Sequence, residues 1–220
     1  KNDTFAHSLK SNYPQHLIMY IPKINLATDQ EEIVEFMKRF SFATIITSNN
    51  NIPIATHLPF LVSIRDEKII LTSQIAKVND QSKDLENHQI LVIFSEPHAY
   101  ISPTHYDKEL NVPTWNYISV HAYGDGKLIT KTEEVFKVLD QTIENYESSF
   151  LEKWNSFSLE YKTNMAKGIV AFEISINDLQ AKKKISQDKS ETEKQKIIDA
   201  LSKSSDSNEQ YIAEYMNKSK

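Results

Sequence analysis

The 220-residue chain contains no cysteine. This absence excludes disulfide bonds, zinc sites built on thiolates, and cysteine nucleophiles. Apolar runs are also short, because none approaches the roughly 18 residues that a membrane-spanning helix needs. The first 17 residues are mostly polar and lack the apolar core of a secretory signal peptide. We therefore expect a cytoplasmic protein that makes no contact with a membrane.

Glycine is scarce, and Gly124, Gly126 and Gly168 are the only three in the chain. Walker loops and Rossmann fingerprints need several glycines, because the backbone must approach phosphate groups closely. Neither pattern is present, which excludes these common nucleotide-binding loops. If a nucleotide-like cofactor binds, side chains must hold its phosphate.

Positive charge is in deficit, since 25 Lys and Arg residues face 30 Asp and Glu residues and give a net charge of −5. Such a field repels nucleic acid on average, so any contact with DNA needs a local basic patch. The one basic stretch covers residues 181–203, with seven lysines and four acidic residues. It is either a surface for phosphate contacts or an ordinary solvated helix face. No DNA-reading motif is visible, so DNA stays an open partner.

Hydrophobic patterning predicts both helices and strands, with a capping box at residues 28–31 and a hairpin turn at Asp125-Gly126. Helical spacing covers residues 28–41, 81–87, 133–146, 190–201 and 209–216. Strand patterns cover residues 42–47, 52–62, 69–73, 90–94, 115–130 (as two strands) and 168–176. Strands and helices are segregated along the chain. This order predicts an α+β fold with an antiparallel, barrel-like sheet of about six strands.

Two segments combine residue types that suit ligand binding. Residues 97–121 bring together prolines, aromatic rings, histidines and hydroxyls, which suit a planar ligand or, alternatively, form a rigid loop whose rings fill the core. Residues 71–77 lead from a strand to Thr72, Ser73 and Lys77. Two hydroxyls and an ammonium can bind a phosphate without glycine, although strands often end in this way.

Hydrolase and metalloprotease motifs are missing. The seven histidines show no HExxH spacing, and no GxSxG elbow is present. We therefore assign no catalytic residue and no metal site, although distant histidines could still assemble one in the fold.

Six ordered motifs resemble those of the PaiB-type FMN-binding negative transcriptional regulators. They stand at residues 19–22 (MYIP), 55–59 (ATHLP), 97–103 (PHAYISP), 112–117 (VPTWNY), 120–121 (VH) and 181–187 (AKKKISQ). The resemblance runs from about residue 19 to residue 216. It implies an antiparallel six-stranded split β-barrel with flanking helices, related to the pyridoxamine-phosphate oxidases and flavin reductases. It also implies a homodimer with FMN at the interface.

The resemblance assigns roles to individual residues and boundaries to the domains. Lys77 would hold the FMN phosphate together with Thr72 and Ser73. The isoalloxazine or ribityl side would be lined by Thr56, His57 and Leu58, and the partner subunit would contribute Trp115 and Asn116. Residues 1–18 would form a flexible N-terminal extension, residues 19–180 the split barrel, and residues 181–220 a helical C-terminal segment packing on it.

Three functions follow from this resemblance. The first is a negative transcriptional regulator that binds FMN. The second is a flavin-dependent oxidoreductase acting on a small molecule, in which the flavin supplies the redox chemistry. The third is a barrel that has lost its cofactor, because Gln74, Asp80 and Ser82 stand where the family usually has His, Pro and Trp.

Overall fold

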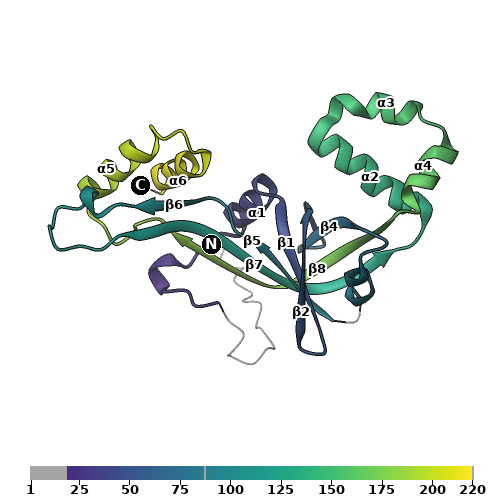
Figure 1. The fold of residues 1–220 in the computed structure, drawn as a ribbon, viewed down its shortest axis with the longest axis horizontal. Helices are drawn as coiled ribbons and strands as arrows, with labels where there is room; N and C mark the ends of the chain where they lie inside the picture. The colour runs from purple at the N-terminus through teal and green to yellow at the C-terminus, as the bar shows by residue number, and fades with distance from the viewer. Residues whose placement is uncertain (1–18, 87, 220) are drawn as a thin grey trace, which may run out of the picture. The chain divides into compact units, whose positions relative to one another are not determined.

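We describe residues 19–86 and 88–219 of the chain in a computed structural model (Figure 1). The extension expected over residues 1–18 lies outside this part. An eight-stranded sheet has the order β2-β1-β5-β7-β8-β4-β3, with β6 paired to β7. Its strands are β1 (Phe42–Asn49), β2 (Ile52–Pro59), β3 (Leu61–Arg65), β4 (Lys68–Ala76), β5 (Gln89–Phe94), β6 (His98–Ile101), β7 (Thr114–Ile129) and β8 (Ile169–Lys184). The pairings β1–β2, β1–β5, β3–β4, β4–β8 and β6–β7 are antiparallel.

The helices precede and follow the strands or connect them. They are η2 (Lys23–Asn25), α1 (Gln30–Arg39), η3 (Asp80–Asp84), η4 (Pro103–His105), α2 (Thr132–Glu147), η5 (Ser148–Phe150), α3 (Leu151–Ser156), α4 (Leu159–Ala166), α5 (Glu191–Leu201) and α6 (Ser207–Lys218). None of the helices within the described part of the chain is long and apolar enough to cross a membrane. The predicted α+β class and the antiparallel sheet are confirmed.

The number of strands is eight rather than the expected six. The predicted strand over residues 52–62 divides at Phe60, whose backbone N–H donates to the Ser41 carbonyl at 2.8 Å and continues the register of β1 and β2 by one residue. A segment expected as a loop contains the short strand β6, which pairs with β7 over His98–Ile101. Phe60 alone joins β2 to β3, the two outer strands of the sheet order, so the chain itself connects both ends of the sheet.

The predicted hairpin at Asp125-Gly126 is wrong, because β7 continues through both residues. The glycines here serve close packing instead of a turn. A Cβ atom on Gly124 would lie 2.5 Å from the Ser175 carbonyl oxygen, and one on Gly126 would lie 2.0 Å from the Leu85 carbonyl oxygen. Neither residue has a positive φ, so their role is to leave room for a neighbouring backbone.

Two predictions about element ends also change. The side chain that caps α1 is Asp29, which accepts hydrogen bonds from the Glu31 and Glu32 amides at 3.0 and 3.1 Å. A capping box does occur, but at the start of α5, between Ser190 and Glu193. Residues 181–184 belong to strand β8 rather than to a helical segment.

The chain forms two compact units, and the long strands β7 and β8 each contribute residues to both. The first unit contains residues 37–93 and 122–179, and its core includes the fully buried side chains of Ile45, Leu71 and Ile90. The second contains residues 19–36, 94–121 and 180–219, with α5 and α6 beside β6 (Figure 1). Its core includes Ile101, Ile197 and Ile212, none of which is exposed.

Candidate functional site

The predicted flavin-binding residues divide between the two units. Six lie in the first unit, on β2, on β4 and just after β4, and two lie on β7 in the second unit. The first group is Thr56, His57, Leu58, Thr72, Ser73 and Lys77, and the second is Trp115 and Asn116.

A buried polar network surrounds Thr56. Its hydroxyl donates to Gln81 Oε1 at 2.6 Å and accepts from Asn79 Nδ2 at 3.1 Å. Gln81 is 1% exposed, and its amide donates to the Ile54 carbonyl at 3.0 Å and to Thr47 Oγ1 at 3.3 Å. The network therefore fastens η3 to β1 and β2, and Thr56 has a structural task in addition to its predicted ligand role.

Gln81 was not singled out from the sequence, yet it holds this network together. We expect Gln81→Leu to lower the free energy of unfolding by about 1–2 kcal/mol, because the buried partners of its amide lose their hydrogen bonds. Urea unfolding would measure the change. The same substitution at the exposed Gln30 is the control, and equal losses in the two variants would contradict this role for Gln81.

Strand alternation separates Thr72 from Ser73. Ser73 lies on the same face of β4 as the buried Leu71 and Ile75, and its hydroxyl donates to the Pro59 carbonyl at 2.6 Å. Thr72 lies on the opposite face, across from Glu173 of β8. A phosphate on one face of β4 therefore cannot contact both hydroxyls, which the sequence placed in one site.

Lys77 follows β4 and carries a free ammonium group. Its backbone N–H donates to the Gly168 carbonyl at 2.9 Å, which fixes the main chain at this point. Within residues 19–86 and 88–219, its side chain makes no hydrogen bond or ion pair. Two residues later, Asn79 bonds to Thr56, so the turn that carries Lys77 is held against β2.

His57 and Leu58 point to opposite faces of β2. His57 is exposed and its ring stacks on Phe42, with centroids 6.4 Å apart and planes inclined by 23°. Leu58 is 9% exposed and belongs to the core. The outer face of β1 and β2 thus offers an exposed pair of flat rings.

Trp115 and Asn116 differ in what they can reach. Trp115 is 52% exposed and lies between the rings of His98 and Tyr100, at centroid distances of 5.6 and 6.0 Å. Asn116 is fully buried and exchanges hydrogen bonds with Ser186 at 3.0 and 3.1 Å. Trp115 can therefore meet another subunit, whereas Asn116 would first have to leave partners in its own unit.

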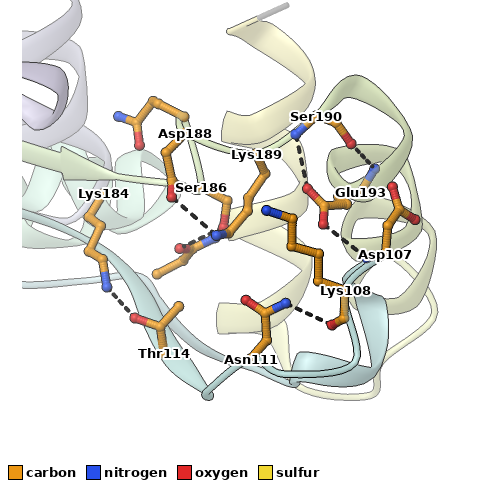
Figure 2. Close-up of polar contacts among 12 residues, drawn as sticks. Asp107, Lys108, Asn111, Thr114, Lys184, Ser186, Asp188, Lys189, Ser190 and Glu193 are labelled. Carbon is orange, nitrogen blue, oxygen red and sulfur yellow. Dashed lines mark hydrogen bonds and ion pairs between the residues drawn. The ribbon is translucent and has the colours of Figure 1, made fainter.

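A polar network from α5 holds the loop that precedes Trp115 (Figure 2). The Glu193 carboxylate accepts from the Asp107 amide at 2.9 Å and from the Ser190 amide at 3.1 Å. The hydrogen bond from the Asp107 amide, followed by that from the Ser190 amide, lowers the pKa of Glu193, because both stabilise the ionised carboxylate. Lys196 adds an ion pair to Asp107 at 2.7 Å. The C-terminal segment thereby positions the loop between β6 and β7.

The lysines of the basic stretch are occupied by protein partners. Lys183 pairs with Glu32 at 2.7 Å, and Lys182 donates to the Tyr20 carbonyl at 3.2 Å and lies over the Tyr117 ring. The partners of the next four are Thr114 for Lys184, Asp188 for Lys189, Glu191 for Lys194 and Asp107 for Lys196. Among the described residues, only Lys203 of the seven has an unpartnered side chain. The stretch is therefore not a free cationic surface.

Potential metal-ligating side chains do not form a cluster in the described part of the chain. Within residues 19–86 and 88–219, no three His, Asp or Glu side chains gather closely enough to hold a metal ion. Burial lowers the pKa of His121, so this histidine is neutral at pH 7. The site offers binding groups, and any redox chemistry has to come from a bound cofactor.

Comparisons with known proteins identify the family. A family model described as "Putative FMN-binding domain" matches residues 19–178. The "Protease synthase and sporulation protein PAI 2" of Bacillus subtilis is 38% identical over 201 residues, covering 90% of this chain and 96% of that protein.

Solved structures show the same fold at low identity. The flavocytochrome Anf3 from Azotobacter vinelandii has a TM-score of 0.57 at 16% identity and covers 72% of this chain and 68% of its own. The FAD and heme binding protein from Mycobacterium smegmatis has a TM-score of 0.57 at 13% identity and covers 73% of each chain. Fold, family model and relative agree that this chain belongs to the PaiB-type family of FMN-binding split-barrel proteins.

Proposed function

We propose that this chain is an FMN-binding negative transcriptional regulator of the cytoplasm that acts as a homodimer. The Bacillus subtilis relative, named a protease synthase and sporulation protein, supports a regulatory role, since it matches nearly the whole chain. The observation that carries the flavin site is the unpaired ammonium of Lys77 on a backbone-fixed turn.

The residues present fit the chemistry of FMN. Its phosphate suits the free Lys77 ammonium, and its planar ring suits the exposed His57–Phe42 pair. Gln74 Oε1 is buried without a hydrogen-bond partner among the described residues, and a ribityl hydroxyl is the kind of donor that it lacks. The departures at Asp80 and Ser82 have local partners, because Asp80 pairs with Lys83 at 2.5 Å and the Ser82 amide donates to the Asn79 carbonyl.

Each residue near the flavin has a defined task in this proposal. Lys77 holds the phosphate, His57 flanks the ring, and Trp115 of the partner subunit closes the site. Bound FMN supplies a redox-active ring. Thr56 keeps the turn carrying Lys77 in place through Asn79.

In this proposal gene control does not rest mainly on the lysines of residues 181–203, since six of the seven have protein partners. Gene control would then use another surface or a protein partner.

The test is a strain without this gene, complemented with the wild-type chain or with Lys77→Ala, followed by transcript profiling. Transcripts that rise in the deletion and fall again only with the wild type support the proposal. Steady NAD(P)H oxidation by the purified protein with an added acceptor, without any transcript change, would favour a flavin-dependent oxidoreductase.

An apolar sheet face supports the homodimer. On the outer side of β1 and β5, Ile46 lies opposite Leu91 and both are half-buried, while Phe42 on the same face is 68% exposed. Stable dimers commonly bury more than about 1,200 Å² in total. We expect Ile46→Lys to weaken dimerisation by about tenfold, measured by light scattering across a dilution series. Ile64→Lys on β3 is the control, and a monomeric wild type would contradict the proposal.

A further inference from the structure

Helix α2 turns a polar face toward the sheet of the first unit. Its residues at helical spacing line a cavity of about 600 Å³, and Val138 is the single apolar residue among them. The polar ones are Glu134, Lys137, Gln141, Glu144 and Asn145. A helix that packs on a sheet normally presents an apolar stripe. Here α2 contacts α3 and α4 as well as β3, with Trp154 Nε1 donating to Asp140 at 2.6 Å. Val138 is buried, and the polar residues around it line the cavity.

The strands supply both apolar and polar residues to this cavity, the apolar ones being Leu61, Leu128 and Ile129. Arg65 of β3 makes two hydrogen bonds to the Glu173 carboxylate, at 2.7 and 3.1 Å, which fixes the guanidinium on the sheet. Thr72 also lines the cavity, and its hydroxyl has no hydrogen-bond partner within the described part of the chain. A ligand in the cavity would provide one.

The formal charges of the lining balance, but the ion pairs around the cavity leave more unpartnered cations than carboxylates. Three cations and three carboxylates line the cavity: Arg65, Lys127 and Lys137, and Glu134, Glu144 and Glu173. Glu173 is held by Arg65, and Glu134 lies 3.3 Å from Lys131 outside the cavity. Lys127 and Lys137 have no partner among the described residues, so two free ammonium groups stand against one free carboxylate. This excess favours an anion.

We propose that the cavity under α2 binds a small metabolite with a phosphate or carboxylate group, at a site separate from the flavin anchor. Its volume lies within the range of small-molecule sites, about 300–1,000 Å³. The two lysines bind the anionic group, and Thr72, Gln141 and Asn145 bond to the polar remainder. The site goes beyond flavin binding, because it gives the protein a second, independent small-molecule input.

The test uses the full chain saturated with FMN, and inorganic phosphate and citrate as probes in isothermal titration calorimetry. At least one probe should bind the wild type. Lys127→Met combined with Lys137→Met should weaken that binding by about tenfold or more, the scale of a lost charge-assisted contact. Lys23→Met combined with Lys203→Met removes the same charge from exposed positions of the second unit. This control should change binding by less than about twofold.

FMN titrations of the same variants separate this site from the flavin site. Unchanged FMN affinity in the Lys127 and Lys137 variant, with lost probe binding, supports a second site. No probe binding to the wild type, or equal binding in the double variant and its control, would overturn it. A parallel loss of FMN affinity would make the cavity the flavin phosphate site and also refute the anchor at Lys77. Circular dichroism confirms that each variant is folded.

Discussion

Replacing Lys77 by alanine is expected to weaken FMN binding by about 1.5–3 kcal/mol, or roughly 10- to 150-fold in Kd. The ammonium is a free charge in the described structure, so a phosphate meets no competing carboxylate there. The fold should not suffer, because the side chain is exposed and the backbone N–H still bonds to Gly168. Quenching of flavin fluorescence gives the affinity.

A nearby lysine provides the matched control for this experiment. Lys83 lies six positions further along the chain and is also exposed, but Asp80 holds its ammonium at 2.5 Å. Lys83→Ala should therefore leave the FMN affinity within about twofold of the wild type. If both variants bind FMN as the wild type does, the phosphate anchor lies elsewhere. Equal losses in the two would indicate a general charge effect instead of a specific contact.

Gly126→Ala should destabilise the first unit more than any other substitution considered for this protein. Its new Cβ would lie 2.0 Å from the Leu85 carbonyl oxygen and 2.7 Å from Ile90 Cδ1. Backbone atoms cannot move aside as a flexible side chain can, so we expect a loss of about 3 kcal/mol or more. For a chain of this length that loss corresponds to roughly 6–12 °C in Tm.

Gly168→Ala is the control that separates the close packing at Gly126 from the general effect of replacing a glycine by alanine. A Cβ at this exposed position meets only the Met165 carbonyl oxygen at 3.3 Å, and its φ is not positive. Its Tm should change by about 3 °C at most. Thermal unfolding followed by circular dichroism measures both variants. Similar Tm values for the two would contradict the packing role of Gly126.

The sequence predicted the fold class because its strongest signals are local. The β-branched run of β1 and the apolar run of β5 are residue types that fit a pleated, buried surface. The hairpin at Asp125-Gly126 was misplaced for the opposite reason. Its turn chemistry is genuine, but the backbones of Leu85 and Ser175 approach these positions, and such contacts are not visible in the local sequence.

The candidate site shows the same division. The exposure of the Lys77 side chain could be predicted, since a lysine that leaves a strand rarely supports the core. The separation of Thr72 from Ser73 follows from strand alternation and could have been anticipated. The ion pairs of the lysines in residues 181–203 could not be anticipated in this way, because Lys183 pairs with Glu32, which is 151 positions away in the sequence. Pairings over such distances depend on the tertiary fold.

The single residue between β2 and β3 limits how this sheet can move. Phe60 is a covalent tether across the point where the two outer strands meet, and one extended residue spans only about 3.3–3.6 Å. The backbone N–H of Phe60 also donates a hydrogen bond to the Ser41 carbonyl, which restricts the movement of this connecting residue. Near Phe60 the outer strands therefore cannot part to form an entrance. A molecule that enters the first unit there has to be admitted by side chains or by the helices that follow β7.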